Sequence, residues 1–202
     1  MKKIFLFSAI MTLALAGAMV SCYFDAARDN PNDPESGDIQ QNDIFLFSTS
    51  EQGDGSFTGR SGANTLCRNR RNEIFPKLPS NNVYAFISIN SSDHISNMDS
   101  NYLVPINKAI KGPTGIVIAN DWNDLLDGSI LETLSNASIT SISWWSASNS
   151  DGSLHDANCT NFDGTAGQGR VGYATIKNEP WITGFTVNCT ETNHVVLCIC
   201  WN

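Results

Sequence analysis

Residues 194–201, HVVLCICW, form an almost unbroken apolar run close to the end of the chain. The run has the length of one strand and contains several β-branched residues, which favour extended backbone. A strand that is apolar at successive positions has both faces buried, whereas a strand at the surface of a sheet alternates apolar and polar residues. The run therefore predicts a central strand with the domain built on both of its sides.

The first residues have the pattern of a secretory signal. Lys2 and Lys3 precede an apolar run over residues 4–18, and small residues then lead to Cys22. The apolar run is too short for a helix that spans a bilayer. Residues 19–22, MVSC, resemble a lipobox, in which the cysteine receives the lipid and becomes the first residue of the mature protein. We expect a signal peptide over residues 1–21 and lipidation of Cys22; the alternative is a plain secreted protein cut nearby.

Residues 22–43 are expected to be a tether between this anchor and a folded domain. Residues 23–43 contain six acidic residues, one basic residue and two prolines, and almost no apolar residue after Phe24. A stretch of this composition buries too little apolar surface to fold, and it repels itself. Residues 44–202 are enough for one domain with its own core and too few for two.

The net charge limits the partners. Without Lys2 and Lys3, the 12 basic residues become ten against 20 acidic ones, so the mature chain carries a charge of −10 at pH 7. This charge argues against nucleic acid as a partner and against contact with an anionic membrane other than through the lipid anchor. The nearest approach to a basic cluster is Arg68, Arg70 and Arg71, for which a solvated helix face is the simplest interpretation.

Besides Cys22, the chain has five cysteines, at positions 67, 159, 189, 198 and 200. An exported protein is expected to oxidise four of them, and four cysteines allow three pairings. No pair has the CxxC spacing of a zinc ribbon or a redox motif. A strand places Cys198 and Cys200 on one face, which is a poor geometry for a bond between them.

The periodicity of apolar residues gives a coarse secondary structure. A helix is expected from Ser61 up to Pro76, with Arg68 and Arg71 on its exposed face. Its predicted buried face comprises Ala63, Leu66, Cys67, Arg70 and Ile74. Further strands are expected at residues 44–49, 83–88, 115–119, 141–145 and 171–176, a brief capped helix at 122–126, and polar loops at 90–101 and 146–170. This order predicts an α+β domain with a mixed, twisted sheet, one or two helices and long polar loops.

Several segments match one known family in order and spacing. They are 55–67 (GSFTGRSGANTLC), 84–88 (YAFIS), 104–106 (VPI), 121–129 (DWNDLLDGS), 145–159 (WSASNSDGSLHDANC) and 196–199 (VLCI). Together they resemble endostatin, the C-terminal domain of certain collagens, and more closely the endostatin-like domain of leptospiral surface lipoproteins. The resemblance is collinear and covers nearly all of residues 44–201.

The resemblance implies a compact C-type lectin-like fold with two disulfides. Endostatin pairs its first cysteine with its fourth and its second with its third, which implies Cys67 with Cys198 and Cys159 with Cys189. Cys200 falls outside that pattern and is expected to be a buried free thiol or, alternatively, a thiol that joins two copies. The related lipoproteins bind host extracellular-matrix and plasma proteins such as laminin, fibronectin, plasminogen and complement factor H.

Two departures from endostatin limit what the resemblance carries. Endostatin binds heparin through exposed arginines, some of them just before its first cysteine, and here that segment keeps only Arg60, with Thr58 and Ser61 in place of bases. The zinc-binding histidines of endostatin lie at the start of its domain, where residues 44–50 offer none. The first departure argues against heparin binding, and the second argues against zinc binding.

Other chemistry finds little support in the sequence. Trp122-Asn123-Asp124 spells the WND triplet of calcium-binding lectins, but there the triplet belongs to a strand near the C-terminus and here it lies on a predicted helix. The three histidines, His94, His155 and His194, have no metal-binding spacing. We therefore expect no enzyme activity, no metal and no cofactor.

The expected function is that of a monomeric, adhesin-like binding module, lipid-anchored in the outer membrane at the cell surface. Trp145 and Trp181 are the candidate contact residues, because an exposed aromatic side chain among polar loops would anchor a protein partner. Arg68 and Arg71 are further candidates. The alternatives are a structural envelope lipoprotein without a host ligand and a calcium-dependent carbohydrate-binding lectin.

Overall fold

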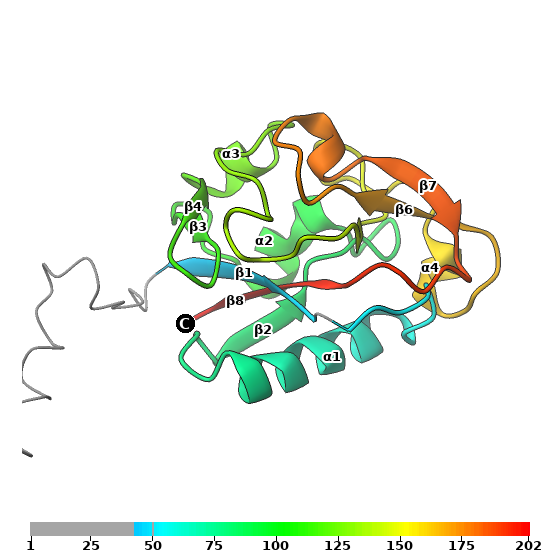
Figure 1. Ribbon diagram of the computed structural model, residues 1–202, viewed down its shortest axis with the longest axis horizontal. Coiled ribbons are helices and arrows are strands. Elements are labelled where there is room, and N and C mark those ends of the chain that lie inside the picture. Colours follow the sequence, from blue (N-terminus) through cyan, green and yellow to red (C-terminus); the bar gives the residue numbers. More distant parts are fainter. Residues whose placement is uncertain (1–42, 50) are drawn as a thin grey trace, which may run out of the picture. The chain divides into compact units, whose positions relative to one another are not determined.

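Figure 1 shows the computed structural model of the protein, which describes residues 43–49 and 51–202. The predicted signal peptide, Cys22 and the tether up to residue 42 lie outside the described residues. No helix within the described part is long and apolar enough to cross a membrane.

The described chain is a mixed α+β structure with two sheets, as the sequence predicts. Its strands are β1 (Ile44–Ser48), β2 (Asn82–Ala85), β3 (Ile110–Lys111), β4 (Val117–Ala119), β5 (Trp144–Trp145), β6 (Gln168–Gly172), β7 (Phe185–Asn188) and β8 (Leu197–Trp201). Its helices are α1 (Gly59–Ile74), α2 (Met98–Tyr102), α3 (Trp122–Leu125) and α4 (Cys159–Phe162), with 3₁₀ turns η1 (Ile95–Asn97) and η2 (Glu179–Trp181).

The main sheet has the strand order β2-β8-β1-β3-β4, so β8 lies between two other strands. It runs antiparallel to both β1 and β2. Leu197 and Ile199 belong to one hydrophobic cluster, and Cys198 and Cys200 to a second. Because successive side chains of a strand point to opposite faces, β8 has a core on each side. The prediction of a central strand that is buried on both faces is confirmed.

The two clusters are covered by different elements. Helix α1 contributes Ala63 and Cys67 to the second cluster and packs along the lower side of the main sheet in Figure 1. The smaller sheet has the order β5-β6-β7 and lies at the upper right. Its strand β5 joins both clusters, since Trp144 belongs to the first and Trp145 to the second.

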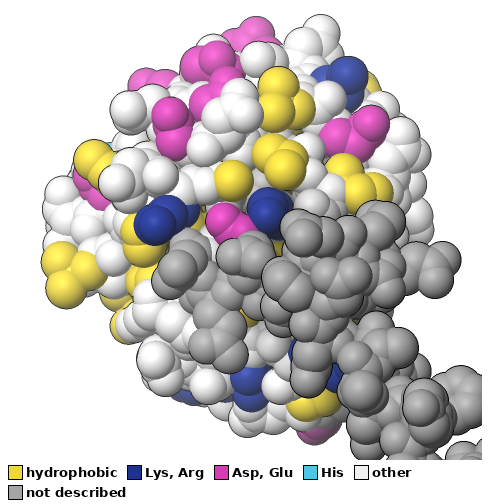
Figure 2. Space-filling model, turned by 90° about the vertical axis from the view of Figure 1, so that its left-hand side faces the viewer, with side chains coloured by type: hydrophobic (Ala, Val, Ile, Leu, Met, Phe, Trp, Pro, Cys, Tyr) yellow, Lys and Arg dark blue, Asp and Glu magenta, His cyan; other side chains and the backbone are white. Residues whose placement is uncertain are grey.

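The surface carries few large apolar side chains. Figure 2 shows the face on the left of Figure 1, where β3 and β4 lie; its hydrophobic side chains form small groups among polar ones, and acidic side chains gather at the top. The exposed large hydrophobic residues of the described chain are Ile74, Leu103, Ile106, Ile116, Leu131 and Tyr173. Such scattered residues are usual on a soluble domain and do not define an interface.

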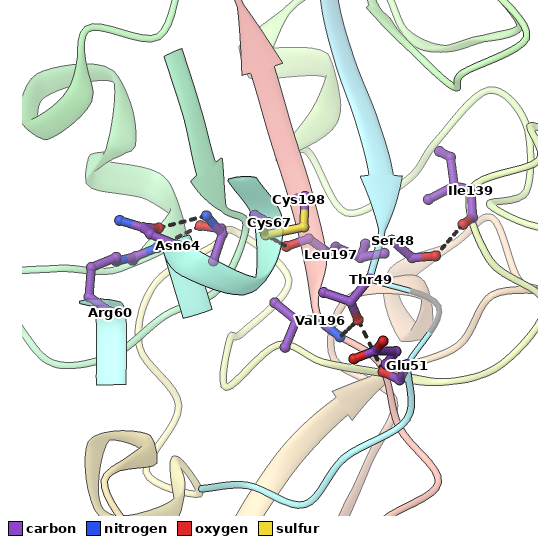
Figure 3. Close-up of a disulfide and its surroundings, with 11 residues drawn as sticks. Ser48, Thr49, Glu51, Arg60, Asn64, Cys67, Ile139, Val196, Leu197 and Cys198 are labelled. Atoms are coloured by element: carbon purple, nitrogen blue, oxygen red, sulfur yellow. Dashed lines mark hydrogen bonds between the residues drawn. A yellow bond between two sulfur atoms is a disulfide. The ribbon is translucent and has the colours of Figure 1, made fainter. Parts of the chain in front are cut away.

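Two disulfides join distant parts of the chain. Cys67 on α1 bonds Cys198 on β8 across a sequence separation of 131 residues (Figure 3). Cys159 bonds Cys189 across a separation of 30 residues. This is the pairing that the resemblance implies, and it is confirmed. Cys200 is free and buried, and burial raises the pKa of its thiol to about 12, so it stays protonated and unreactive.

Helix α4 is a left-handed turn. Its four residues have φ values between +50° and +63°, at Cys159 (50°), Thr160 (54°), Asn161 (63°) and Phe162 (58°). Residues with a Cβ atom disfavour this conformation by about 1–2 kcal/mol each, so tertiary contacts must hold it. The disulfide at Cys159 and the stacking of Phe162 on Phe57, with ring centroids 4.8 Å apart, supply those contacts.

The outer edge of β2 is closed by side chains of α1. Asn64 Oδ1 accepts a hydrogen bond of 2.8 Å from the Ala85 amide, and the Arg60 guanidinium donates to the carbonyls of Ala85 and Ile87 (Figure 3 labels Arg60 and Asn64). Arg60 also forms a 2.7 Å ion pair with Asp93. An open strand edge invites pairing with another chain, and these bonds occupy it.

The structure corrects parts of the predicted secondary structure. Ile74, predicted on the buried face of the helix, is 49% exposed and is the last residue of α1. Residues 90–101, predicted as an exposed loop, contain η1 and α2 with Ile95 and Met98 fully buried. The predicted strand at 171–176 is β6, which begins at Gln168 and ends at Gly172.

We expect the two disulfides to differ in their contribution to stability. By the chain-entropy model, closing 131 residues stabilises the fold by about 5 kcal/mol and closing 30 residues by about 3.6 kcal/mol. Cys67→Ala/Cys198→Ala should therefore lower the free energy of unfolding by more than Cys159→Ala/Cys189→Ala. All four sulfurs are buried, so the two variants are matched. Guanidinium denaturation measures both, and an equal or reversed order would contradict the expectation.

We also expect Asn64→Ala to be destabilising, because it leaves the buried Ala85 amide without its acceptor. The expected loss in the free energy of unfolding is about 1–3 kcal/mol. Asn69→Ala, on the exposed side of the same helix, is the matched control and should change stability by less than about 0.5 kcal/mol. Equal losses in urea denaturation would show that the Asn64 contact is not what stabilises β2.

Candidate functional site

A groove of about 570 Å³ lies beside the N-terminal half of α1. One wall is the segment that connects β1 to α1, the other is the first turns of α1, and the floor comes from β5 and the residues before β8. Cavities of roughly 300–1,000 Å³ are typical of ligand sites. We therefore take this groove as the candidate functional site.

The floor of the groove is Trp145, His194 and Val196. Trp145 and His194 pack edge to face with ring centroids 4.8 Å apart. The indole Nε1 of Trp145 donates a hydrogen bond of 3.0 Å to the carbonyl of Gly53, in the wall segment. The floor and this wall are therefore tied together by a core residue.

The wall segment runs alongside residues 194–196, which lead into β8. The amide of Gly53 donates to the His194 carbonyl at 2.9 Å, and Thr49 Oγ1 accepts from the Val196 amide at 3.2 Å (Figure 3). Farther along, Asp54 Oδ1 accepts from the Ser56 amide at 3.0 Å, which is an Asx turn. The wall is thus held by main-chain bonds, and its two carboxylates belong to Glu51 and Asp54.

The opposite wall is helix α1. Thr58 precedes the helix in a left-handed conformation, and the Gly62 amide donates to the Thr58 carbonyl. A Cβ atom at Gly62 would lie 1.6 Å from the Phe57 carbonyl oxygen, so only glycine permits this approach. Phe57 is held by its stacking on Phe162 and remains partly exposed in the groove, with Leu66 one turn farther along α1.

His194 is the titratable group in the floor. Its side chain is 2% exposed, its Nδ1 lies 2.6 Å from Ser143 Oγ, and its Nε2 lies 3.6 Å from Glu191 Oε2. Burial lowers the pKa of His194, and the Glu191 carboxylate opposes that shift in part. The imidazole is therefore neutral at pH 7.

Ser143, His194 and Glu191 lie next to one another, but only His194 is among the residues that line the groove. A general base must reach both a nucleophile and the substrate. Ser143 is bonded to His194 but is not among the residues that line the groove. Within the described residues, no three His, Cys, Asp or Glu side chains gather as a metal site would require. The arrangement is suited to binding by shape, charge and hydrogen bonds.

Trp145 and Trp181, the candidate contact residues, do not lie at the surface. Both side chains have no exposed surface, because two hydrophobic clusters enclose them. Trp181 packs on Phe86 and Trp144, away from the groove. Trp145 reaches the groove only as its floor.

The predicted role of Arg71 is also corrected. Its guanidinium donates to the carbonyls of Pro76, Leu78 and Pro79, and so holds the chain that follows α1. Arg68 is exposed, as predicted, and its Nη2 donates to Thr65 Oγ1 at 3.2 Å. Arg60, the base retained from the heparin-binding pattern, is bound to Asp93. The arginines of α1 therefore do not act together as one surface.

No pattern in the sequence predicts the groove. Residues 53–59 have the composition of a glycine-rich turn, and the one signal for a site in them is Phe57, an aromatic residue among Gly, Ser and Thr. An aromatic residue in a polar turn needs a partner, and Phe162 lies 105 positions farther along the chain. No local pattern links the two.

Comparisons with protein-family models and with curated proteins give no match for this chain. The endostatin-like resemblance stays a prediction.

We expect His194 to make the stability of the protein depend on pH. Its folded-state pKa lies below the ordinary value of 6.5, so the unfolded chain binds a proton more readily as the pH falls below about 6.5. Stability should fall from pH 7.5 to pH 5.5, and His194→Asn, which retains a partner for Ser143, should make that fall smaller. His155, whose pKa burial also lowers, is present in both proteins. Urea denaturation at the two pH values tests this, and equal falls would contradict it.

Proposed function

We propose that this protein is a surface-displayed, lipid-anchored binding module for host extracellular-matrix or plasma proteins. In this proposal Cys22 carries the lipid, the acidic residues up to 43 form the tether, and residues 44–202 form an endostatin-like domain of C-type lectin-like fold. The domain binds as a monomer and carries out no catalysis.

The observation that carries the proposal is the disulfide pattern. Cys67 bonds Cys198 and Cys159 bonds Cys189, which is the first-with-fourth and second-with-third order that the resemblance implies. Three pairings of these four cysteines were open from the sequence. The antiparallel pairing of β1 with β8 also brings the two ends of the domain together, as expected for a lectin-like body.

The charge supports a protein ligand over a polyanion. The chain has 20 acidic residues against 12 basic ones, and Arg60, Arg71 and Arg170 are bonded to acceptors of the domain itself. Nucleic acid and heparin need clustered bases that are free to pair with phosphate or sulfate. A protein surface with its own basic residues is the better match.

We expect saturable binding of the purified protein to at least one of laminin, fibronectin, plasminogen and factor H, with albumin as the control surface. Cys67→Ala/Cys198→Ala should lose that binding, since it opens the domain that presents the loops. Binding to none of the four above albumin would contradict the proposed function.

The location of the protein is tested on intact cells. Added protease should remove the domain while a periplasmic protein stays whole, and Cys22→Ser should move the protein out of the membrane fraction. Survival of the domain on intact cells would instead favour a structural envelope lipoprotein.

A further inference from the structure

We propose that the groove beside α1 binds a lysine or arginine side chain of a protein ligand. Its apolar stem lies along Phe57 and Leu66, and its charged end faces Glu51 and Asp54. This inference rests on the proposed function, because it assumes that the ligand is a protein, and it names the residue class that the domain recognises.

The groove is negatively charged. Glu51 and Asp54 are the charged residues of its lining, which contains no lysine or arginine, and His194 in the floor is neutral. The ion pairs of the described residues are Arg60–Asp93 and Lys111–Asp43, and Glu191 lies 3.6 Å from the neutral His194. Neither Glu51 nor Asp54 has a basic partner among them.

The nearest bases are engaged elsewhere. Arg60 lies in the first turn of α1, between the lining residues Thr58 and Ser61. Its guanidinium is bound to Asp93 and to the carbonyls of Ala85 and Ile87. Arg68 Nη2 donates to Thr65 Oγ1, and Arg68 forms an ion pair with neither Glu51 nor Asp54. No ion pair of the described residues therefore neutralises either carboxylate, and a cation from a ligand would do so.

The apolar part of the groove suits a long side chain. Phe57 is partly exposed and held in place by Phe162, and Leu66 is partly exposed on the helix. Lysine and arginine cover apolar surface with their methylene stems while the charged end stays near water. A guanidinium or ammonium group also interacts favourably with an aromatic face.

The floor adds no positive charge to the groove. His194 is 98% buried, and its Nε2 lies 3.6 Å from Glu191 Oε2, a residue that is not part of the groove lining. Its side chain lines the groove. Its imidazole is neutral, so it does not repel a cation in the groove.

The test uses the purified protein and two small probes, Nα-acetyl-lysine amide and Nα-acetyl-norleucine amide, which share a stem and differ in charge. In an NMR titration, the lysine probe should shift amide signals of the groove, such as those of Gly53, Phe57 and Thr65, and lose affinity as salt rises. The norleucine probe should bind at least fivefold more weakly. Equal binding of the two probes, or shifts elsewhere, would overturn the inference.

A double variant separates the groove from the net charge. Glu51→Gln/Asp54→Asn should weaken the lysine probe about five- to tenfold, from the loss of two exposed charge contacts. Asparagine at 54 keeps the oxygen that accepts from Ser56. The matched control, Glu73→Gln/Asp156→Asn, removes the same charge from exposed positions outside the groove and should change affinity less than twofold. Equal effects of the two double variants would overturn the inference.

A host-protein arm distinguishes the inference from the proposed function. If a host protein binds, excess lysine probe should compete with it and Glu51→Gln/Asp54→Asn should weaken it by a similar factor. Host binding that neither change affects would overturn the groove inference and leave the proposed function standing. Lysine-probe binding in the groove without any host-protein binding would support the inference and overturn the proposed function.

Discussion

The structure depends on β8 and the bond at Cys198. This strand pairs with β1 on one edge and β2 on the other, and its side chains enter a hydrophobic cluster on each face. The disulfide to Cys67 adds α1 to the same strand. The main sheet, helix α1 and both hydrophobic clusters therefore meet at the five residues of β8. A substitution in this strand changes the packing on both of its faces.

Side-chain hydrogen bonds, both local and between distant segments, help to fix the polar connections between the regular elements. Asp121 caps α3 by accepting from the Asn123 and Asp124 amides, and Ser88 Oγ meets Ser148 Oγ at 2.7 Å from 60 residues away. The second disulfide and Phe162 hold the left-handed turn of α4 against its own backbone preference. That turn supports Phe57, so the groove wall is positioned by contacts outside the groove.

Residues that the sequence suggested for the surface lie in the core. Trp145 and Trp181 were candidate contact residues, and both are buried in the hydrophobic clusters. Arg71 predicted an exposed base, and the carbonyls after α1 took its donors. No local pattern distinguishes Glu51 and Asp54 from the other acidic residues, and the fold makes them the charged lining of the groove.

The sequence by itself determined the central strand, the helix that carries Cys67, a capped start of the short helix at residue 120 or 121 and the α+β class, because period, capping and turn chemistry are local. It also left two sulfurs of β8 on one face, since side chains in a strand alternate with a period of two. Only the tertiary structure decided which tryptophans are covered, how Phe57 meets Phe162 and where the unpaired carboxylates face. Those depend on contacts between residues far apart in the chain, and no local pattern carries them.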